Sequence, residues 1–71
     1  MNNLERIIAV FQRAFENCPP IDAESSKATV EPWDSFGHLI LILELEKEFD
    51  IKLSAAQIES IKSVKDILNL L

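Results

Sequence analysis

The segment from residue 35 to residue 49 constrains the fold of this chain more strongly than any other. Its sequence, SFGHLILILELEKEF, has the length of one helix, and apolar side chains recur around most of its circumference. At about 100° per residue, one side carries Leu41, Ile42, Leu45 and Phe49, and the opposite side carries Phe36, Ile40, Leu43 and Lys47, with Leu39 at the edge. A helix with apolar residues on opposite sides needs either complete burial or a second partner.

The chain is too short to bury both sides of such a helix. Its 71 residues correspond to a single domain spanning 1–71, and a domain of this size is stable by roughly 3–5 kcal/mol. A hydrophobic fraction of 48% excludes a disordered tail. A single glycine and the absence of tyrosine favour helices, so we expect an all-α fold, a small helical bundle.

The two longest helices have clear start signals. Asn2 and Glu5 match a capping box, and apolar residues then recur at helical spacing until a pair of prolines, so the first helix is placed at about 3–16. Asp34 is a favourable N-cap for the second helix, at about 35–49, and its charge suits the positive helix end.

Two further helices follow after a short link. Ser54 and Gln57 form an S-x-x-Q capping box that predicts a short helix at about 55–60. Ser63 and Asp66 repeat this pattern before a last apolar-periodic segment. The expected fold is therefore a small four-helix bundle, with three main helices, a short third helix and a long loop between the first two.

That long loop, residues 18–33, has its own apolar members. We expect Ile21, Val30 and Trp33 to anchor it to the bundle, with one short turn near 22–26. A connection longer than about 12–15 residues in a compact domain is usually functional or disordered, and these anchors predict an ordered one.

The two apolar sides of the second helix receive different roles. The side assigned to the core comprises Ile42, Leu45 and Phe49. The side assigned to an exposed patch that docks onto partner proteins comprises Phe36, Ile40 and Leu43. The alternative, in which the long loop folds over this patch, stays open. Acidic side chains between Glu31 and Asp50 rim the patch, which indicates a recognition surface.

Charge and cysteine content exclude several classes of protein. The net charge is −5, and no cluster of Lys and Arg exists for a phosphate backbone, so nucleic acid is excluded as a partner. A single cysteine, Cys18, forbids an internal disulfide and is interpreted as a partly buried structural thiol; no metal-ligand spacing is present. No signal peptide or membrane-spanning run is found, so we expect a cytoplasmic chain without membrane insertion.

Asp34, Ser35 and His38 resemble a catalytic triad in composition only. His38 lies one turn after Ser35, but Asp34 is adjacent to the serine and diverges from it, so the acid cannot orient the imidazole from behind. A G-x-S-x-G elbow is also missing. Self-contained hydrolysis is therefore rejected, and His38 is interpreted as a surface or loop-contacting residue. Ser35 remains either an attachment point or a simple helix-start serine.

Taken together, these features resemble those of the acyl carrier protein family. The Asp34-Ser35-Phe36 run is similar to the family's Asp-Ser-Leu attachment motif. The sequence LEKEFDI at 45–51 is similar to the acidic end of its second helix, and SVKD at 63–66 to the opening of its last helix. The resemblance covers essentially the whole chain, because the helix lengths and the long first loop also agree.

The resemblance implies a specific chemistry. Ser35 would receive 4′-phosphopantetheine from coenzyme A through a separate Mg²⁺-dependent phosphopantetheinyl transferase, with Asp34 helping to hold the metal in that complex. Acyl groups would ride as thioesters on the terminal thiol of the arm. In the family's four-helix bundle the cargo tucks between helices, notably the second and third, and the candidates for lining such a pocket are Leu41, Ile42, Leu45, Ile58 and Ile61.

The chain departs from the typical fatty-acid carrier at two positions. Gly37 and Ile40 stand where that carrier has acidic docking residues, which favours a specialised carrier whose partners have an apolar groove. The residues expected to dock partners are Phe36, Leu39, Ile40, Leu43, Glu46 and Lys47. The partners implied are acyl ligases, synthases and acyltransferases, and a monomer is expected.

The sequence thus predicts an acyl carrier for fatty acid, polyketide or related specialised biosynthesis, and not an enzyme. Two alternatives stay open. One is an aminoacyl or peptidyl carrier, including a D-alanyl carrier, although Pro32-Trp33 replaces the glycine-rich approach common in peptidyl carriers. The other is an unmodified helical adaptor that only binds proteins.

Overall fold

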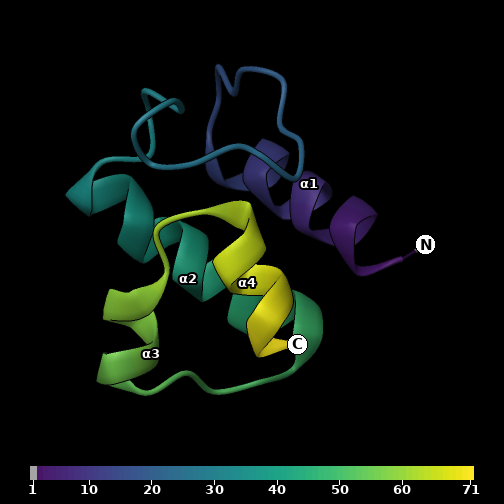
Figure 1. Ribbon diagram of the computed structural model, residues 1–71, viewed down its shortest axis with the longest axis vertical. Coiled ribbons are helices and arrows are strands. Elements are labelled where there is room, and N and C mark those ends of the chain that lie inside the picture. Colours follow the sequence, from purple (N-terminus) through teal and green to yellow (C-terminus); the bar gives the residue numbers. More distant parts are fainter. Residues whose placement is uncertain (1) are drawn as a thin grey trace.

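The computed structural model describes residues 2–71 and is all-helical over that range, with no β-strand (Figure 1). The helices, in chain order, are α1 (Asn3–Ala14), α2 (Ser35–Phe49), α3 (Ala55–Ser60) and α4 (Val64–Leu70). The body measures 28 × 26 × 19 Å along its principal axes. The small all-α bundle that the sequence predicts is confirmed, as are the bounds of α2 and α3.

Helix α1 begins as predicted and ends two residues early. The Asn2 side chain accepts the Glu5 N–H at 2.8 Å, which caps the helix start. At the other end Phe15 is extended, with φ −122° and ψ 122°, so the helix stops at Ala14. This conformation accompanies burial of the Phe15 ring, which meets Phe11 edge to face at 6.0 Å. The predicted end at residue 16 was wrong because this contact is tertiary.

The long loop between α1 and α2 consists largely of successive turns. The Ser25 N–H donates to the Asp22 carbonyl at 3.1 Å, which confirms the turn predicted near 22–26. A second turn follows, in which the Val30 N–H donates to the Ser26 carbonyl at 2.9 Å. The Trp33 N–H then donates to the Val30 carbonyl at 2.9 Å, so local hydrogen bonds continue up to the start of α2.

The middle of this loop is joined to the link between α3 and α4. Ser26 and Ser63 form an isolated antiparallel bridge. The Lys27 N–H donates to the Lys62 carbonyl at 3.0 Å, and the Val64 N–H donates to the Ser25 carbonyl at 3.0 Å. A segment far from α4 in sequence is therefore fixed beside its N-terminus.

The hydrophobic core is formed by α1, α2, α4, the loop and the residue after α3. Its buried members are Ile7, Val10, Phe11, Phe15, Val30, Trp33, Leu41, Ile42, Leu45, Ile61, Val64 and Ile67. Val30 and Trp33 confirm that the loop is anchored to the bundle as predicted, with Ile21 half-buried against the core. None of the residues within α3 is buried.

Charged side chains join α1 to α2 at the edge of this core. Arg6 pairs with the Glu48 carboxylate at 2.9 Å and also donates to the Glu48 carbonyl at 2.8 Å. Arg13 reaches Glu48 at 3.1 Å and Glu44 at 3.7 Å. The Arg6 hydrogen bonds, and then those from Arg13, hold the pKa of the Glu48 carboxyl below its ordinary value of 4.5.

The core side of α2 differs from the prediction at one position. Leu41, Ile42 and Leu45 are buried, but Phe49 is only half-buried. Its ring lies in the last turn of α2, where the Arg6 guanidinium stacks over it at 4.3 Å from the centroid. Phe49 is therefore a packed residue at the margin of the core, and its assignment to the core itself was wrong.

The opposite side of α2 is open to solvent. Phe36, Leu39 and Leu43 are 73%, 58% and 59% exposed, so the loop does not cover them. Ile40, predicted to be exposed with them, is half-buried. We call Phe36, Leu39 and Leu43 the apolar strip; their spacing of three and four residues places them along one face of the helix.

No helix among residues 2–71 combines the length and apolar character that crossing a bilayer requires.

Candidate functional site

The start of α2 is built by Asp34. Its carboxylate oxygen Oδ1 accepts the Gly37 N–H at 2.8 Å, and its carbonyl accepts the His38 N–H at 2.7 Å. The predicted N-cap is thus confirmed, and the carboxylate suits the positive end of the helix dipole. Asp34 supplies the capping oxygen, and Ser35, the first helical residue, is exposed.

Gly37 is buried directly beneath this cap and cannot carry a side chain. A Cβ atom there would collide with the Pro32 carbonyl oxygen and lie 2.9 Å from Cε1 of Phe15. The φ angle of Gly37 is not positive. Glycine is therefore needed here because a side chain has no space, and not because of the backbone conformation. The loop and the end of α1 therefore press closely on the first turn of α2, which fixes where Ser35 stands.

His38 joins three parts of the molecule and is buried. The Trp33 indole N–H donates to its Nδ1 at 2.8 Å, and its Nε2 lies 2.8 Å from the Ile58 carbonyl oxygen in α3. An indole N–H only donates and a carbonyl only accepts, so the imidazole is neutral with its proton on Nε2. The predicted loop contact is confirmed, whereas the predicted surface position was wrong.

Trp33 carries this connection into the core. Its side chain is 1% exposed and packs edge to face against Phe11 at 5.0 Å, while its ring lies nearly parallel to that of His38. Helix α1, the loop, α2 and α3 are therefore linked in series through Phe11, Trp33, His38 and Ile58.

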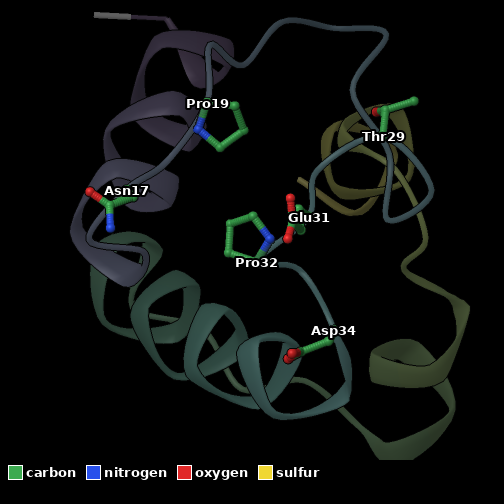
Figure 2. Close-up of a pocket in the computed structure, with 6 residues that line it drawn as sticks. All are labelled: Asn17, Pro19, Thr29, Glu31, Pro32 and Asp34. Atoms are coloured by element: carbon green, nitrogen blue, oxygen red, sulfur yellow. The ribbon is translucent and has the colours of Figure 1, made fainter.

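A cavity of about 630 Å³ lies on one side of the α2 start (Figure 2). Its lining comes from the loop after α1 and from the cap of α2: Asn17, Pro19, Thr29, Glu31, Pro32 and Asp34. The two proline rings contribute apolar surface to this lining, and Glu31 and Asp34 contribute carboxylates. Ser35 does not line it.

A second cavity, of about 420 Å³, contains the serine. It lies between the first turn of α2, helix α3 and the loop, and its lining residues are Lys27, Ser35, His38, Leu39, Ala55, Ile58 and Glu59. We call it the serine cavity. Ser35 contributes to its lining, and Leu39, Ala55 and Ile58 contribute apolar surface.

The residues proposed from the family resemblance to line an acyl pocket divide into two groups. Ile58 is half-buried and lines the serine cavity. The remaining candidates, Leu41, Ile42, Leu45 and Ile61, are buried in the core and line neither cavity. Sequence reasoning missed Lys27, Ala55 and Glu59, because their proximity to Ser35 depends on the bridge between loop and α4 link, and on the placement of α3.

The charged docking candidates have internal partners. Glu46 accepts the Leu53 N–H at 2.8 Å and so ties down the link after α2. This carboxylate therefore supports the fold, and a docking role for Glu46 stays a prediction. Lys47 is exposed and lies 3.6 Å from Glu44, one turn earlier in the helix.

Cys18 is half-buried, as predicted. Its thiol donates to the Pro19 carbonyl at 3.3 Å, and burial raises the pKa of the thiol above its ordinary value. A protonated thiol is a weak nucleophile and a poor metal ligand. Across residues 2–71, no group of three or more His, Cys, Asp or Glu side chains is placed to hold a metal ion.

Comparison with protein-family models, with curated proteins and with solved structures finds no match to this chain.

Proposed function

We propose that this protein is a carrier of the acyl carrier protein type, in which Ser35 holds a 4′-phosphopantetheine arm. The observation that carries the proposal is the placement of Ser35. It is exposed as the first residue of α2, directly after the acid that caps the helix. The close approach of Gly37 to Pro32 and Phe15 holds this turn in one position. A separate enzyme can therefore reach a well-defined nucleophile.

The state of His38 supports attachment over catalysis by this chain. Both imidazole nitrogens are engaged, one by Trp33 and the other by the Ile58 carbonyl. The imidazole therefore has no free nitrogen with which to take the Ser35 proton in this arrangement. A general base must reach the proton that it removes, so the activating base belongs to the transferase.

The loading reaction is a phosphoryl transfer to Ser35. Its oxygen forms a bond to the phosphorus that bears pantetheine in coenzyme A, and the phosphoanhydride bond to the nucleotide breaks. The nucleotide leaves with the electron pair, and the hydroxyl proton passes to the transferase. Asp34 uses Oδ1 for the cap, which leaves Oδ2 to contact the Mg²⁺ that the transferase brings. Such a metal neutralises the charge that develops on the phosphoryl oxygens.

Once loaded, the carrier works by tethering. An acyl thioester on a flexible arm is presented to successive enzymes at a high effective concentration. The apolar strip begins next to Ser35, and exposed apolar patches of this kind mark protein interaction sites. We therefore assign the strip to docking acyl ligases, synthases or acyltransferases, with the acyl group entering and leaving close by.

The test is incubation with coenzyme A, Mg²⁺ and a transferase of broad specificity, followed by intact mass measurement. Wild type should gain the mass of one phosphopantetheine, and Ser35→Ala should gain none. Ser60→Ala removes another exposed helix serine and should load like wild type. No increment on wild type would favour the unmodified adaptor, and an equal increment on Ser35→Ala would reject Ser35 as the attachment point.

A further inference from the structure

We propose that the enzymes that dock on α2 present an uncharged apolar groove to the apolar strip, and that this groove ends in a carboxylate that pairs with Lys47. This inference rests on the proposed function, which assigns the strip to docking. It goes further by naming the chemistry of the partner surface and the direction in which the partner lies along α2.

The exposed face of α2 is apolar along most of its length and ends in a cation. The apolar strip is exposed, and Lys47 follows Leu43 by four residues, so it continues the same face. The Lys47 side chain is 75% exposed. No carboxylate within α2 is exposed. A basic partner surface therefore meets no fully accessible acid on this helix.

The acidic side chains of α2 are engaged by α1 and by the link that follows α2. Glu48 pairs with Arg6 at 2.9 Å and with Arg13 at 3.1 Å, and its side chain is 25% exposed. Glu44 lies 3.7 Å from Arg13 and is 23% exposed. The third acid, Glu46, accepts a backbone N–H from the link at 2.8 Å. A cation on a partner must displace these contacts, so its net gain is small because one polar contact is exchanged for another.

Lys47, in contrast, can change its partner at low cost. Its Nζ lies 3.6 Å from Oε1 of Glu44, one turn earlier, and exposed ion pairs of this kind contribute little to stability. When Lys47 turns to a carboxylate on a partner, Glu44 keeps its contact with Arg13. The exchangeable charge at this end of the strip is therefore positive, and it selects an acid on the partner.

The positions of Ser35 and Lys47 set a direction for the partner. From the helical rise per residue, Lys47 lies about 18 Å along the axis from Ser35. Asp34 places an exposed carboxylate at the Ser35 end. Opposite charges at the two ends of an apolar face favour one orientation of a docked partner over the reverse. The carboxylate of the partner is thus expected at that distance from the entrance that receives Ser35.

The experiment uses two phosphopantetheinyl transferases of known structure as docking probes. One has Lys and Arg side chains around its active-site entrance, and the other has an uncharged apolar groove that ends in Asp or Glu. The efficiency of loading, kcat/KM, is measured for each with coenzyme A and Mg²⁺. For wild type and the apolar-groove transferase, this efficiency should change less than about threefold between low and high salt, because apolar contacts are not screened.

Variants of the strip should affect the two transferases in opposite directions. Leu43→Glu adds an exposed carboxylate to the strip, so it should lower kcat/KM about tenfold with the apolar-groove transferase and raise it with the basic one. Leu43→Gln removes apolar surface without adding charge, and should lower only the efficiency of the apolar-groove transferase. These paired changes cancel differences in intrinsic activity between the two enzymes.

The role of Lys47 is tested on the apolar-groove transferase with Lys47→Glu. Its kcat/KM should fall several-fold, mainly through a higher KM. Lys52→Glu makes the same charge change at an exposed lysine outside α2, and should load like wild type. Circular dichroism of each variant verifies that the helices are retained.

The outcomes separate this inference from the proposed function. A steep loss of efficiency with salt for wild type, or a Leu43→Glu chain that gains nothing with the basic transferase, would overturn the apolar groove while Ser35 is still loaded. Equal results for Lys47→Glu and Lys52→Glu would overturn the carboxylate at the end of the groove. If neither transferase loads wild type, the proposed function fails together with this inference.

Discussion

The two sides of α2 are held in different ways. On the α1 side, α2 is held by a buried aromatic cluster around Phe11 and Trp33. It is also held by ion pairs from Arg6 and Arg13 to Glu48. On the α3 side, no residue within the short helix is buried; it is joined to α2 by the hydrogen bond between His38 and the Ile58 carbonyl and by partial burial of Ile58. In Figure 1, α3 lies away from α1, with α2 and α4 between them.

The two sides of α2 therefore contribute differently to the surroundings of Ser35. The α1 side is the closely packed side, and it fixes the location of Ser35 through Gly37 and the cap of Asp34. The α3 side is the lightly packed side, and it supplies one wall of the serine cavity. Segments with few buried contacts open at lower free energy than core helices. Ser35 is thus held in a fixed position beside a cavity wall that can move.

The largest expected loss of stability comes from removing the Trp33 side chain on the closely packed α1 side. Trp33→Ala should lower the free energy of unfolding by about 3–5 kcal/mol, because a side chain 1% exposed leaves a cavity. That loss is comparable to the whole stability of a domain this small. Chemical denaturation followed by circular dichroism measures it.

Phe49→Ala is the matched control for this loss. Phe49 is half-buried at the margin of the core, so its removal should cost clearly less than that of Trp33. Equal losses for the two variants would contradict the contrast between core and margin.

An intermediate effect is expected from His38, which connects the two sides. His38→Ala leaves the buried Trp33 N–H without its acceptor, at a cost of about 1–3 kcal/mol. It also removes the hydrogen bond to the Ile58 carbonyl. Amide hydrogen exchange should therefore speed up across α3 more than across α1.

The variants His38→Gln and His38→Asn distinguish the two hydrogen bonds of His38, one with Trp33 and one with the Ile58 carbonyl. Gln places a side-chain N–H near the position of Nε2 and should retain slow exchange in α3, whereas Asn offers an acceptor near Nδ1 for Trp33 only. If exchange in α3 is the same in wild type and His38→Ala, the hydrogen bond does not hold this helix.

The smallest effect concerns the ion network on the closely packed side. The Glu48 pKa is lowered, so its contribution to stability is fully present above the ordinary value of 4.5 and is lost as pH falls through the lowered value. Glu48→Gln should therefore melt below wild type at neutral pH, and the two curves should converge in acid. Glu16→Gln, at an exposed position, controls for the loss of one carboxylate; a difference between Glu48→Gln and wild type that grows in acid would contradict this sign.

The sequence predicts well whatever depends on neighbouring residues. The bounds of α2 and α3 follow from the caps of Asp34 and Ser54, which are local hydrogen bonds. The burial of Val30 and Trp33 follows from lone apolar residues in a polar loop.

Features that depend on distant partners were missed or wrongly placed. The end of α1 depends on where the Phe15 ring packs, and the burial of His38 depends on a carbonyl twenty residues away. The hydrogen bond between Glu46 and the Leu53 N–H was also missed, because nothing in the sequence pattern indicates it. Lys27 reaches the serine cavity only because the loop bridges to Ser63, and nothing in its own segment indicates that bridge.

Whether Ser35 is the attachment point is decided by locating the modification on the loaded chain. Wild type is incubated with coenzyme A, Mg²⁺ and the transferase, digested, and fragmented in a mass spectrometer. We expect one phosphopantetheine, whose added mass appears in every fragment ion that contains Ser35 and in none that lacks it. An adduct on Ser25, Ser26 or Ser54, or an unmodified chain, would contradict it.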